Sequence, residues 1–307
     1  MKTPKRQPGP VGKTSGFFSS PEATAVLKVA KQVYAGFVKS VELMALLKDY
    51  EKEPVWSTKA VRDLSEQQAF DLLLHHVYWG EILVDEIFRA DAGGKIVYPK
   101  PGQQIKVRTK MAGVDYYQAS NRGFPGNHPK ETFMPTPAFA LVLYRLAKRL
   151  GGGYYGATRI VWGGIGHGGE GKVRNCHEIG TCVDFYGAYT RHGTVDVLAD
   201  WAKKPIFNSD GKPRKVPNWT EDKWGNASET YYRLRTGDAG LSYYFFADVY
   251  QFAFEQCTVG TTDVPELKEG QRVMAGTIIH PDYARAYLRQ SHLEHMHFQL
   301  GDAFVPA

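Results

Sequence analysis

Two short segments of the chain gather residues that could bind a metal ion. The first reads H-x-x-G-x-x-x-D, with His177, Gly180 and Asp184 at its fixed positions, and the second, from His292 to His297, reads H-x-E-H-x-H. Zinc takes imidazole nitrogens and carboxylate oxygens, and a catalytic zinc keeps three protein ligands and one open position for water. Each pattern alone also occurs among surface or hydrogen-bonded histidines. Together they predict a metal site built from both segments.

The spacing within each segment indicates how these residues are presented. His295 and His297 lie two apart in a segment with the hydrophobic rhythm of a strand, so both should project from one face. One of them can then bind the metal while the other meets the substrate. Glu294 should point to the opposite face. In the first segment, Gly180 permits a tight turn that lets both ends of the motif reach one ion.

The two motifs resemble those of the lysostaphin-type and D-alanyl-D-alanine peptidase superfamily, whose members hold zinc with an H…D…H triad on a small antiparallel sheet. They are similar in particular to the penicillin-insensitive murein endopeptidases, which carry H-x-x-G-x-x-x-D and end in H-x-x-H-x-H. The resemblance implies that His177, Asp184 and His297 are the zinc ligands. It also implies that His292 and His295 line the catalytic centre.

A related pattern leaves the general base open between two residues. D-alanyl-D-alanine carboxypeptidases carry E-x-x-H with the Glu as base, and Glu294 with His297 satisfies this pattern too. Strand alternation favours His295 as the base, whereas a twist or bulge before it would bring Glu294 into the site. His292 is a candidate for stabilising the oxyanion or contacting the substrate. Arg159, on a predicted strand, could hold a substrate carboxylate or form a structural salt bridge.

The elements that must position these residues are predicted from apolar periodicity and capping residues. Helices are expected at 21–50, 65–90, 135–150 and 241–257, strands at 158–162, 273–279 and 295–300, and short strands and loops over 91–135. The expected fold class is α+β: a small antiparallel β-sheet zinc-peptidase core with flanking helices, preceded by a helical N-terminal region.

The chain is expected to divide into a mobile tail at 1–20, a helical N-terminal region at 21–95 and a zinc peptidase domain at 96–307. The tail is rich in Pro, Gly, Lys and Ser, which is typical of segments without a packed core. The resemblance covers roughly residues 135–307. A long polar insertion at 202–240 departs from the family's pattern, and long loops in enzymes often border the active site.

Composition restricts the classes of partner. The formal charge of +6 suits an anionic polymer, and peptidoglycan is the partner that the resemblance implies. No nucleic-acid motif is present, and no stretch reaches the roughly 18 apolar residues of a membrane span. The N-terminus starts with positive charge but lacks the apolar core of a signal peptide. The three cysteines, Cys176, Cys182 and Cys257, exclude a disulfide-dense scaffold, although Cys257 could bridge to one of the others.

The expected function is a zinc-dependent peptidoglycan peptidase that hydrolyses stem-peptide or cross-link amide bonds, with endopeptidase activity favoured. A protein made in the cytoplasm without a signal peptide, yet acting in the periplasm or cell wall, needs a specialised route such as type VI secretion. Secretion machinery or an immunity protein would then be partners of an antibacterial effector. The alternatives are a phage-type cell-wall lysin, a D,D-carboxypeptidase, a zinc hydrolase of another amide and a non-catalytic peptide-binding module on the same fold.

Overall fold

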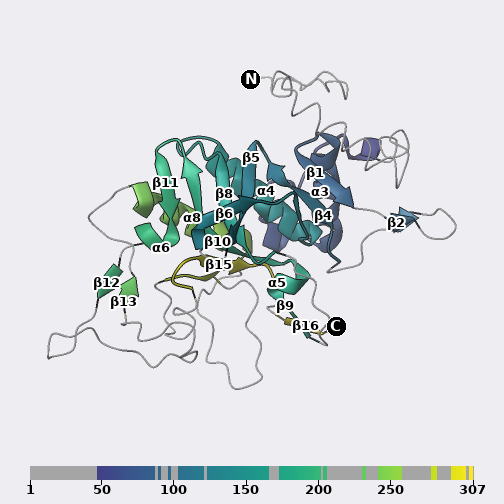
Figure 1. Cartoon of the computed structure of the whole chain (residues 1–307). Helices are drawn as coiled ribbons and strands as arrows, with labels where there is room; N and C mark the ends of the chain where they lie inside the picture. Colours follow the sequence, from purple (N-terminus) through teal and green to yellow (C-terminus); the bar gives the residue numbers. More distant parts are fainter. Residues whose placement is uncertain are drawn as a thin grey trace.

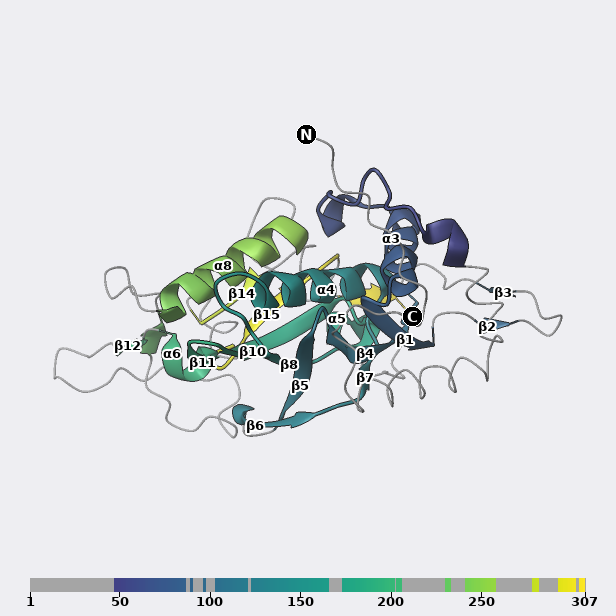
Figure 2. The ribbon, with the colours of Figure 1, turned by 90° about the horizontal axis from the view of Figure 1, so that it is seen from above.

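The computed structural model describes residues 47–86, 89–90, 96–97, 103–120, 123–165, 173–201, 203–205, 230–232, 241–257, 278–281, 292–301 and 304–306. A ten-stranded sheet runs through this part of the chain. Helices α3, α4 and α8 lie together on one face of the sheet, as Figures 1 and 2 show. The described residues therefore combine helices and strands around one sheet, as predicted.

The sheet has the strand order β1-β4-β5-β8-β10-β15-β14, with β6 pairing β5, β7 pairing β4 and β11 pairing β10. The bounds are Ile82–Glu86 for β1, Lys106–Met111 for β4, Val114–Ser120 for β5, Gly123–Pro129 for β6, Thr132–Phe133 for β7, Arg159–Gly163 for β8, Cys182–Thr190 for β10, Gly193–Asp196 for β11, Ile278–Ile279 for β14 and Met296–Gln299 for β15. Every pairing is antiparallel except that of β5 with β8, which is parallel. The predicted sheet was small and purely antiparallel, and the observed sheet is neither.

Local turn chemistry explains the extra strands. Ala112 and Gly113 both have positive φ, at +48° and +84°, and they join β4 directly to β5. Two consecutive positive φ values match the twist of a tight hairpin, so the region predicted as short strands and loops builds full-length strands. Helix α4 (Pro137–Gly151) follows β7 and precedes β8. A helical crossover of this kind lets β8 run parallel to β5.

Helix α3 (Glu66–Tyr78) is shorter than the predicted helix at 65–90. Ser65 caps it by accepting from the backbone N–H of Gln68, whose side chain accepts from Ser65 N in return. Gly80, with φ +68°, follows the last helical turn. The prediction was wrong beyond this point because a left-handed residue ends the helix, and the next residues form β1 instead.

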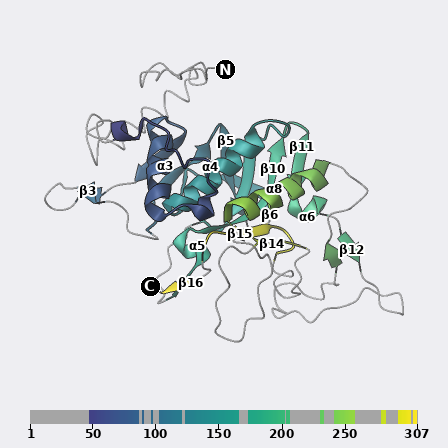
Figure 3. The same ribbon diagram turned by 180° about the vertical axis from the view of Figure 1, so that it is seen from behind.

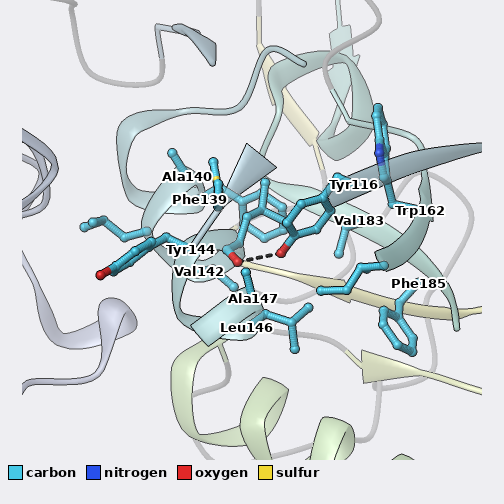
Figure 4. Close-up of a cluster of buried hydrophobic side chains, with 14 of the residues drawn as sticks. Tyr116, Phe139, Ala140, Val142, Tyr144, Leu146, Ala147, Trp162, Val183 and Phe185 are labelled. Atoms are coloured by element: carbon cyan, nitrogen blue, oxygen red, sulfur yellow. Dashed lines mark hydrogen bonds between the residues drawn. The ribbon is translucent and has the colours of Figure 1, made fainter. Parts of the chain in front are cut away.

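Helix α4 confirms the prediction for 135–150. Thr136 accepts from the N–H of Phe139, and Pro137 occupies the first turn, where its missing N–H costs no hydrogen bond. The helix packs its apolar face on the sheet (Figure 4). At this contact the buried hydroxyl of Tyr116, on β5, donates to the backbone oxygen of Leu143 at 2.5 Å. This bond satisfies a polar group that burial would otherwise leave unpaired.

Helix α8 (Leu241–Cys257) has the bounds predicted for the aromatic helix and lies beside α4 (Figure 3). Three of its own side chains, Phe245, Phe246 and Phe252, are buried in the core. Arg149, in the last turn of α4, forms a salt bridge with Asp248 of α8, with 2.5 Å between Nη2 and Oδ1. The buried residues of α3, α4, α8 and the sheet belong to one hydrophobic cluster. Residues 47–86 therefore share their core with the strands that carry the motifs.

Three two-stranded ribbons complete the described structure. They are β2 (Arg89–Ala90) with β3 (Ile96–Val97), β9 (Val173–Asn175) with β16 (Phe304–Pro306), and β12 (Lys203–Pro205) with β13 (Thr230–Tyr232). The short helix α6 (Val197–Asp200) precedes the predicted insertion at 202–240, and the last ribbon lies within this insertion, most of which is outside the described residues. The predicted tail at 1–20 also lies outside them, as does the helix at 21–50 except for Leu47 and the 3-10 turn η2 (Lys48–Tyr50).

Candidate metal centre

One short helix and two adjacent strands, β10 and β15, carry residues of the two motifs, and β8 pairs with the other edge of β10 (Figure 1). On β10, Asp184 lies directly opposite Gly163 of β8 and His297 of β15. The alternate residues of β10 and β15 are buried on the helix side of the sheet, and they are Val183, Phe185, Met296 and Phe298. Since neighbours along a strand face opposite sides, this burial directs Asp184 and His297 to the other face.

Helix α5 (Cys176–Ile179) positions the first histidine. Its N-terminus is fixed by a capping box: Asn175 Oδ1 accepts from Glu178 N at 2.9 Å, and Glu178 Oε2 accepts from Asn175 N at 2.8 Å. Gly180 ends the helix with φ +74°, and a Cβ there would lie 2.3 Å from Met134 O. Only glycine fits this turn, which confirms the predicted role of Gly180 and brings His177 back toward Asp184.

The structure brings the three predicted ligands together around one oxygen of Asp184. His297 Nδ1 lies 2.9 Å from Asp184 Oδ1, and His177 Nε2 lies 3.7 Å from the same atom. Donor atoms on one tetrahedral zinc, each about 2.0–2.1 Å from the ion, are separated by about 3.3 Å. The observed distances bracket this value, so these atoms could share one ion. We call His177 Nε2, Asp184 Oδ1 and His297 Nδ1 the carboxylate site.

Each of these two histidines has one ring nitrogen that faces away from Asp184, here called the outer nitrogen, and it contacts an oxygen acceptor. His177 Nδ1 donates to Gly164 O at 2.6 Å. Gly164 has φ +71°, and a Cβ on it would lie 2.2 Å from that nitrogen, so the close approach requires glycine. Metal-ligating histidines commonly donate their second N–H to a carbonyl in this way, which fixes the ring and its tautomer. His177 is therefore left with its lone pair on Nε2, facing Asp184.

Gln299 does the same for His297. The side-chain nitrogen of Gln299 donates to Gly301 O at 3.0 Å, so its Oε1 faces His297 Nε2 at 3.1 Å. An oxygen can only accept, so Nε2 carries the hydrogen and Nδ1 keeps the lone pair. This lone pair faces the carboxylate of Asp184 at 2.9 Å. Two electron-rich atoms at that distance need a cation between them, either a proton or a metal ion, and the residues present therefore fit a metal.

The electrostatics follow from burial and mutual contact. Burial opposes charge on Asp184, but His295, His177 and His297 outweigh it and hold the pKa of that carboxyl well below its usual range. Burial also opposes charge on His297, yet its hydrogen bonds with Asp184 and Cys176 raise its pKa to about 10. For His295 burial dominates over the attraction of Asp184, so its pKa is lowered. The carboxylate thus stays charged, and His295 stays neutral with one lone pair available.

His295 and Glu294, the two predicted bases, are placed differently. His295 Nε2 lies 3.6 Å from Asp184 Oδ1, whereas its Nδ1 is buried and has no hydrogen-bond partner among the described residues. The ring of His292 lies 4.7 Å from that of His295, centroid to centroid. Glu294 instead directs its carboxylate toward Gly123 of β6, where a Cβ would lie 3.1 Å from Oε2. The structure therefore groups His292 and His295 with Asp184.

Arg159 is not part of this group. Its guanidinium stacks between two rings, 3.8 Å from the centroid of Tyr117 and 4.6 Å from that of Tyr189. Arg159 is the first residue of β8, and the residue opposite Asp184 is the last, so about 13 Å of strand separates them. Among the described residues, Arg159 makes these cation–π contacts and no salt bridge, which was one of its two predicted roles, and the other role, substrate binding, stays a prediction.

Sequence reasoning missed three residues beside the site. Tyr186 packs its ring 5.1 Å from that of His295, and its position two residues after Asp184 on the strand was the available signal. Cys176 and Cys182 lie with their sulfurs 2.7 Å apart, and Cys182 Sγ is 3.2 Å from His177 Nδ1. Their spacing fits no zinc ribbon, so it carried no signal of its own.

Within the described residues, two sets of donor atoms besides the predicted triad are close enough to hold a metal ion, and they divide the triad between them. In each set the donors lie within 4.8 Å of one another. The first comprises Cys176, His177, Cys182 and His297, and the second comprises Asp184, His292 and His295. All three cysteines are buried free thiols, so the suggested bridge to Cys257 is not present. Asp184 and His297 join the two sets through their 2.9 Å contact.

No known protein family, curated protein or solved structure matches the chain. The resemblance to zinc peptidases therefore rests on the two sequence motifs alone. Among the helices of the described residues, none combines the length and apolar character that crossing a membrane requires.

Proposed function

We propose that the protein is a zinc-dependent peptidoglycan peptidase, with the metal held at the carboxylate site by His177, Asp184 and His297. The observation that carries this proposal is the arrangement of the outer nitrogens. Gly164 O and Gln299 Oε1 accept from His177 and His297, so both lone pairs face Asp184 Oδ1. Two nitrogens and one oxygen form a donor set that suits zinc and leaves a fourth position for water.

Accessibility supports a catalytic role over a purely structural one. The side chains of His177 and Asp184 keep 25% and 18% of their exposure, whereas that of His297 keeps 5%. Water and substrate can thus approach from the side of the first two ligands. Zinc, when bound, polarises a scissile carbonyl and lowers the pKa of water toward neutrality.

His295 is the proposed general base. It is a neutral imidazole whose Nε2 faces Asp184, and its ring packs against Tyr186, which restrains it. His292 and Tyr186 are the proposed donors to the oxyanion of the tetrahedral intermediate. Burial and the nearby carboxylates of Asp184 and Glu294 raise the pKa of Tyr186, so its phenol remains a neutral hydrogen-bond donor.

The substrate proposal rests on the resemblance and on charge. A net charge of +6 favours approach to an anionic wall polymer, and Arg159, held between two rings, is a candidate for binding a carboxylate distant from the scissile bond. We propose cleavage of cross-links between stem peptides, with delivery to the periplasm as an antibacterial effector.

Zinc content tests the metal. Wild-type protein treated with oxidised glutathione, so that the thiols of Cys176 and Cys182 cannot bind the metal, should hold about one zinc per chain, and His177→Ala and Asp184→Ala treated in the same way should lose it. His192→Ala is the matched control, because His192 stacks on Tyr154 at a distant turn and should leave zinc content unchanged. Retention of zinc by both ligand variants would overturn the carboxylate site.

Digestion of purified peptidoglycan, followed by mass analysis of the fragments, tests the reaction. His295→Gln should keep its zinc and lose roughly 10²–10⁴-fold in rate, as expected for removal of a general base. Glu294→Gln should retain most of the wild-type rate because its carboxylate faces Gly123. Release of cross-linked stem peptides would support an endopeptidase, and loss of a terminal residue alone would indicate a carboxypeptidase. Unchanged fragments from every wall type would eliminate the substrate proposal.

Directed expression tests the site of action. The chain should be toxic to a sensitive bacterium when a signal peptide sends it to the periplasm, and harmless when it stays in the cytoplasm. The His295→Gln variant provides the control for catalysis. Equal toxicity in both compartments would count against a wall substrate.

A further inference from the structure

The two proposed ligand histidines, His177 and His297, have possible metal-donor atoms next to both of their ring nitrogens. On one side lies Asp184, and on the other lie the two thiols: Cys182 Sγ is 3.2 Å from His177 Nδ1, and Cys176 Sγ is 3.8 Å from His297 Nε2. The sulfurs themselves are 2.7 Å apart. Both cysteines are buried, so this grouping is fixed by the packing of α5 against β9, β10 and β16 and does not arise from a mobile surface.

Strand register and the short helix explain why the thiols lie there. Cys182 precedes Asp184 by two residues on β10 and lies opposite Gln299 of β15, so it shares the face of the carboxylate site. Cys176 is the first residue of α5, next to His177 in sequence. The same elements that bring the two histidines to Asp184 therefore place a sulfur behind each of them.

We propose that Cys176, Cys182, His177 Nδ1 and His297 Nε2 form a second metal site, the thiol site, which competes with the carboxylate site for the same two histidines. Two thiolates and two imidazoles are a complete tetrahedral set for zinc, cobalt or cadmium and leave no position for water. A metal ion held there is therefore catalytically silent.

The competition follows from the chemistry of imidazole. A neutral ring has one nitrogen that carries hydrogen and one with a lone pair, so it can serve one metal ion at a time. When Nδ1 of His177 and Nε2 of His297 donate to Gly164 and Gln299, the lone pairs serve the carboxylate site. When those outer nitrogens bind a metal with the thiolates, the inner nitrogens carry the hydrogens and the carboxylate site is lost.

Oxidation of the thiols selects between the sites. In thiol–disulfide exchange with a small-molecule disulfide, one thiolate attacks a sulfur of that molecule and releases its first thiol. The second cysteine then attacks the mixed disulfide, releasing the second thiol and closing the bond between Cys176 and Cys182. The protein loses two electrons and two protons, and the small disulfide is reduced. Because both sulfurs are buried, α5 must open transiently for the exchange.

The biological consequence rests on the proposed function. In a reducing cytoplasm the thiol site would hold the metal and keep the peptidase silent in the cell that makes it. In an oxidising compartment the disulfide would remove the thiol site and leave the histidines to the carboxylate site. Cysteines stay reduced in the cytoplasm, whereas disulfides form and persist in oxidising compartments such as the bacterial periplasm.

Cobalt substitution tests the thiol site without relying on activity. Metal-free protein, kept reduced by a phosphine under anaerobic conditions, receives one equivalent of Co²⁺, and thiolate-to-cobalt charge-transfer absorption is recorded in the near ultraviolet. Wild type and Cys257→Ser should show this absorption, since Cys257 is buried at the end of α8 and outside the cluster. The double variant Cys176→Ser, Cys182→Ser should lose it. Its absence from reduced wild type would overturn the proposal.

Asp184→Asn separates the two sites. In the reduced protein this variant should keep the charge-transfer absorption, because Asp184 is not a ligand of the thiol site. After treatment with oxidised glutathione, wild type should bind cobalt without that absorption, and Asp184→Asn should not bind it at all. Loss of the absorption from reduced Asp184→Asn, or failure of oxidised wild type to bind cobalt, would refute competing sites.

These outcomes are distinguishable from failure of the proposed function. If the protein does not cleave peptidoglycan, the cobalt spectra still report whether the thiol site exists. If the thiol site is absent, zinc content and wall digestion still report on the peptidase. The cysteine variants keep the test valid even where Asp184→Asn fails to fold.

Discussion

Gln299 decides which nitrogen of His297 faces Asp184, although it does not belong to the proposed ligands. Its amide is oriented by Gly301 O, and its Oε1 can only accept from His297 Nε2. A residue of this kind contributes to metal affinity through the tautomer of the ligand it contacts. The tautomer of His297 depends on the buried side-chain amide of Gln299, so a single substitution of Gln299 can measure its effect on metal affinity.

Replacing Gln299 with leucine should weaken metal binding by roughly 10–100-fold, because the lone pair of His297 is no longer held toward Asp184. Competition with a chromogenic chelator measures this affinity. Gln256→Leu is the control: it removes another core-edge amide, which contacts Arg145 and Val61. The interpretation fails if both variants change the affinity equally.

At the same scale, the sequence allowed some site residues to be predicted and left others hidden. The grouping of the paired histidines with Asp184 was predictable because the two motifs together supply the donor types that zinc prefers. Tyr186 and the two cysteines were not, since their roles depend on which face of β10 looks toward the motifs. That choice is made by burial of Val183 and Phe185 against the helices, which no local pattern specifies.

Helix α5 has only four residues, so its N-terminal cap contributes much of its stability. Asn175→Ala should cost about 1 kcal/mol of folding free energy and also weaken metal binding, because Cys176 and His177 begin the helix. Ser65→Ala removes the equivalent capping box from α3, far from the site. It should cost a similar free energy in urea denaturation and leave metal affinity unchanged. Equal metal affinity in both variants would contradict a positioning role for the cap.

The turn at Gly180, which ends α5, leads to a second prediction about the stability of this region. Gly180→Ala must place a Cβ 2.3 Å from Met134 O in a left-handed residue, so the strain of the backbone and the clash act together. Gly153→Ala has the same left-handed strain but no heavy atom within 4 Å of its Cβ. The control should cost about 1 kcal/mol, and Gly180→Ala should cost roughly 2 kcal/mol more. Thermal unfolding of both variants gives the comparison, and equal costs would show that the turn relaxes freely.

Elements with clear local signals were predictable. Helices α4 and α8 and strand β8 lie where apolar periodicity and capping residues placed them. The helix at 65–90 was predicted too long because apolar residues on both sides of Gly80 continue a helical spacing. The parallel pairing of β5 with β8 had no local signal, because the paired residues are 44 positions apart and the burial of one face against α4 fixes their register.

On the scale of the whole molecule, hydrogen bonds of Glu81 to His76 and Tyr144 tie α3 to α4. Glu81 Oε2 lies 2.7 Å from His76 Nδ1. Burial alone would raise the pKa of Glu81, but hydrogen bonds with His76 and with Tyr144 of α4 outweigh it and lower the pKa to about 2. A carboxyl whose pKa is depressed on folding stabilises the protein above its unfolded pKa and loses this contribution as the pH falls toward the folded value.

Glu81→Gln should therefore lower the free energy of unfolding by about 1–2 kcal/mol at pH 7, a range that allows for solvent screening of this part-exposed side chain. The difference from wild type should shrink as pH falls below about 4.5 and vanish near pH 2. Glu131→Gln is the control, because its side chain is 91% exposed. Urea denaturation across this pH range checks the prediction, and a constant difference at every pH would refute it.

The pairing of β10 with β15 also sets the order in which the centre can form during synthesis. Asp184 and His297 are 113 residues apart in the chain. A ribosome adding roughly 5–20 residues per second needs about 6–23 s to travel between them. Throughout that interval the nascent chain carries Asp184 and His177 but not strand β15, so the proposed carboxylate site cannot form. Any product that terminates before β15 is made would lack His297 and with it the proposed carboxylate site.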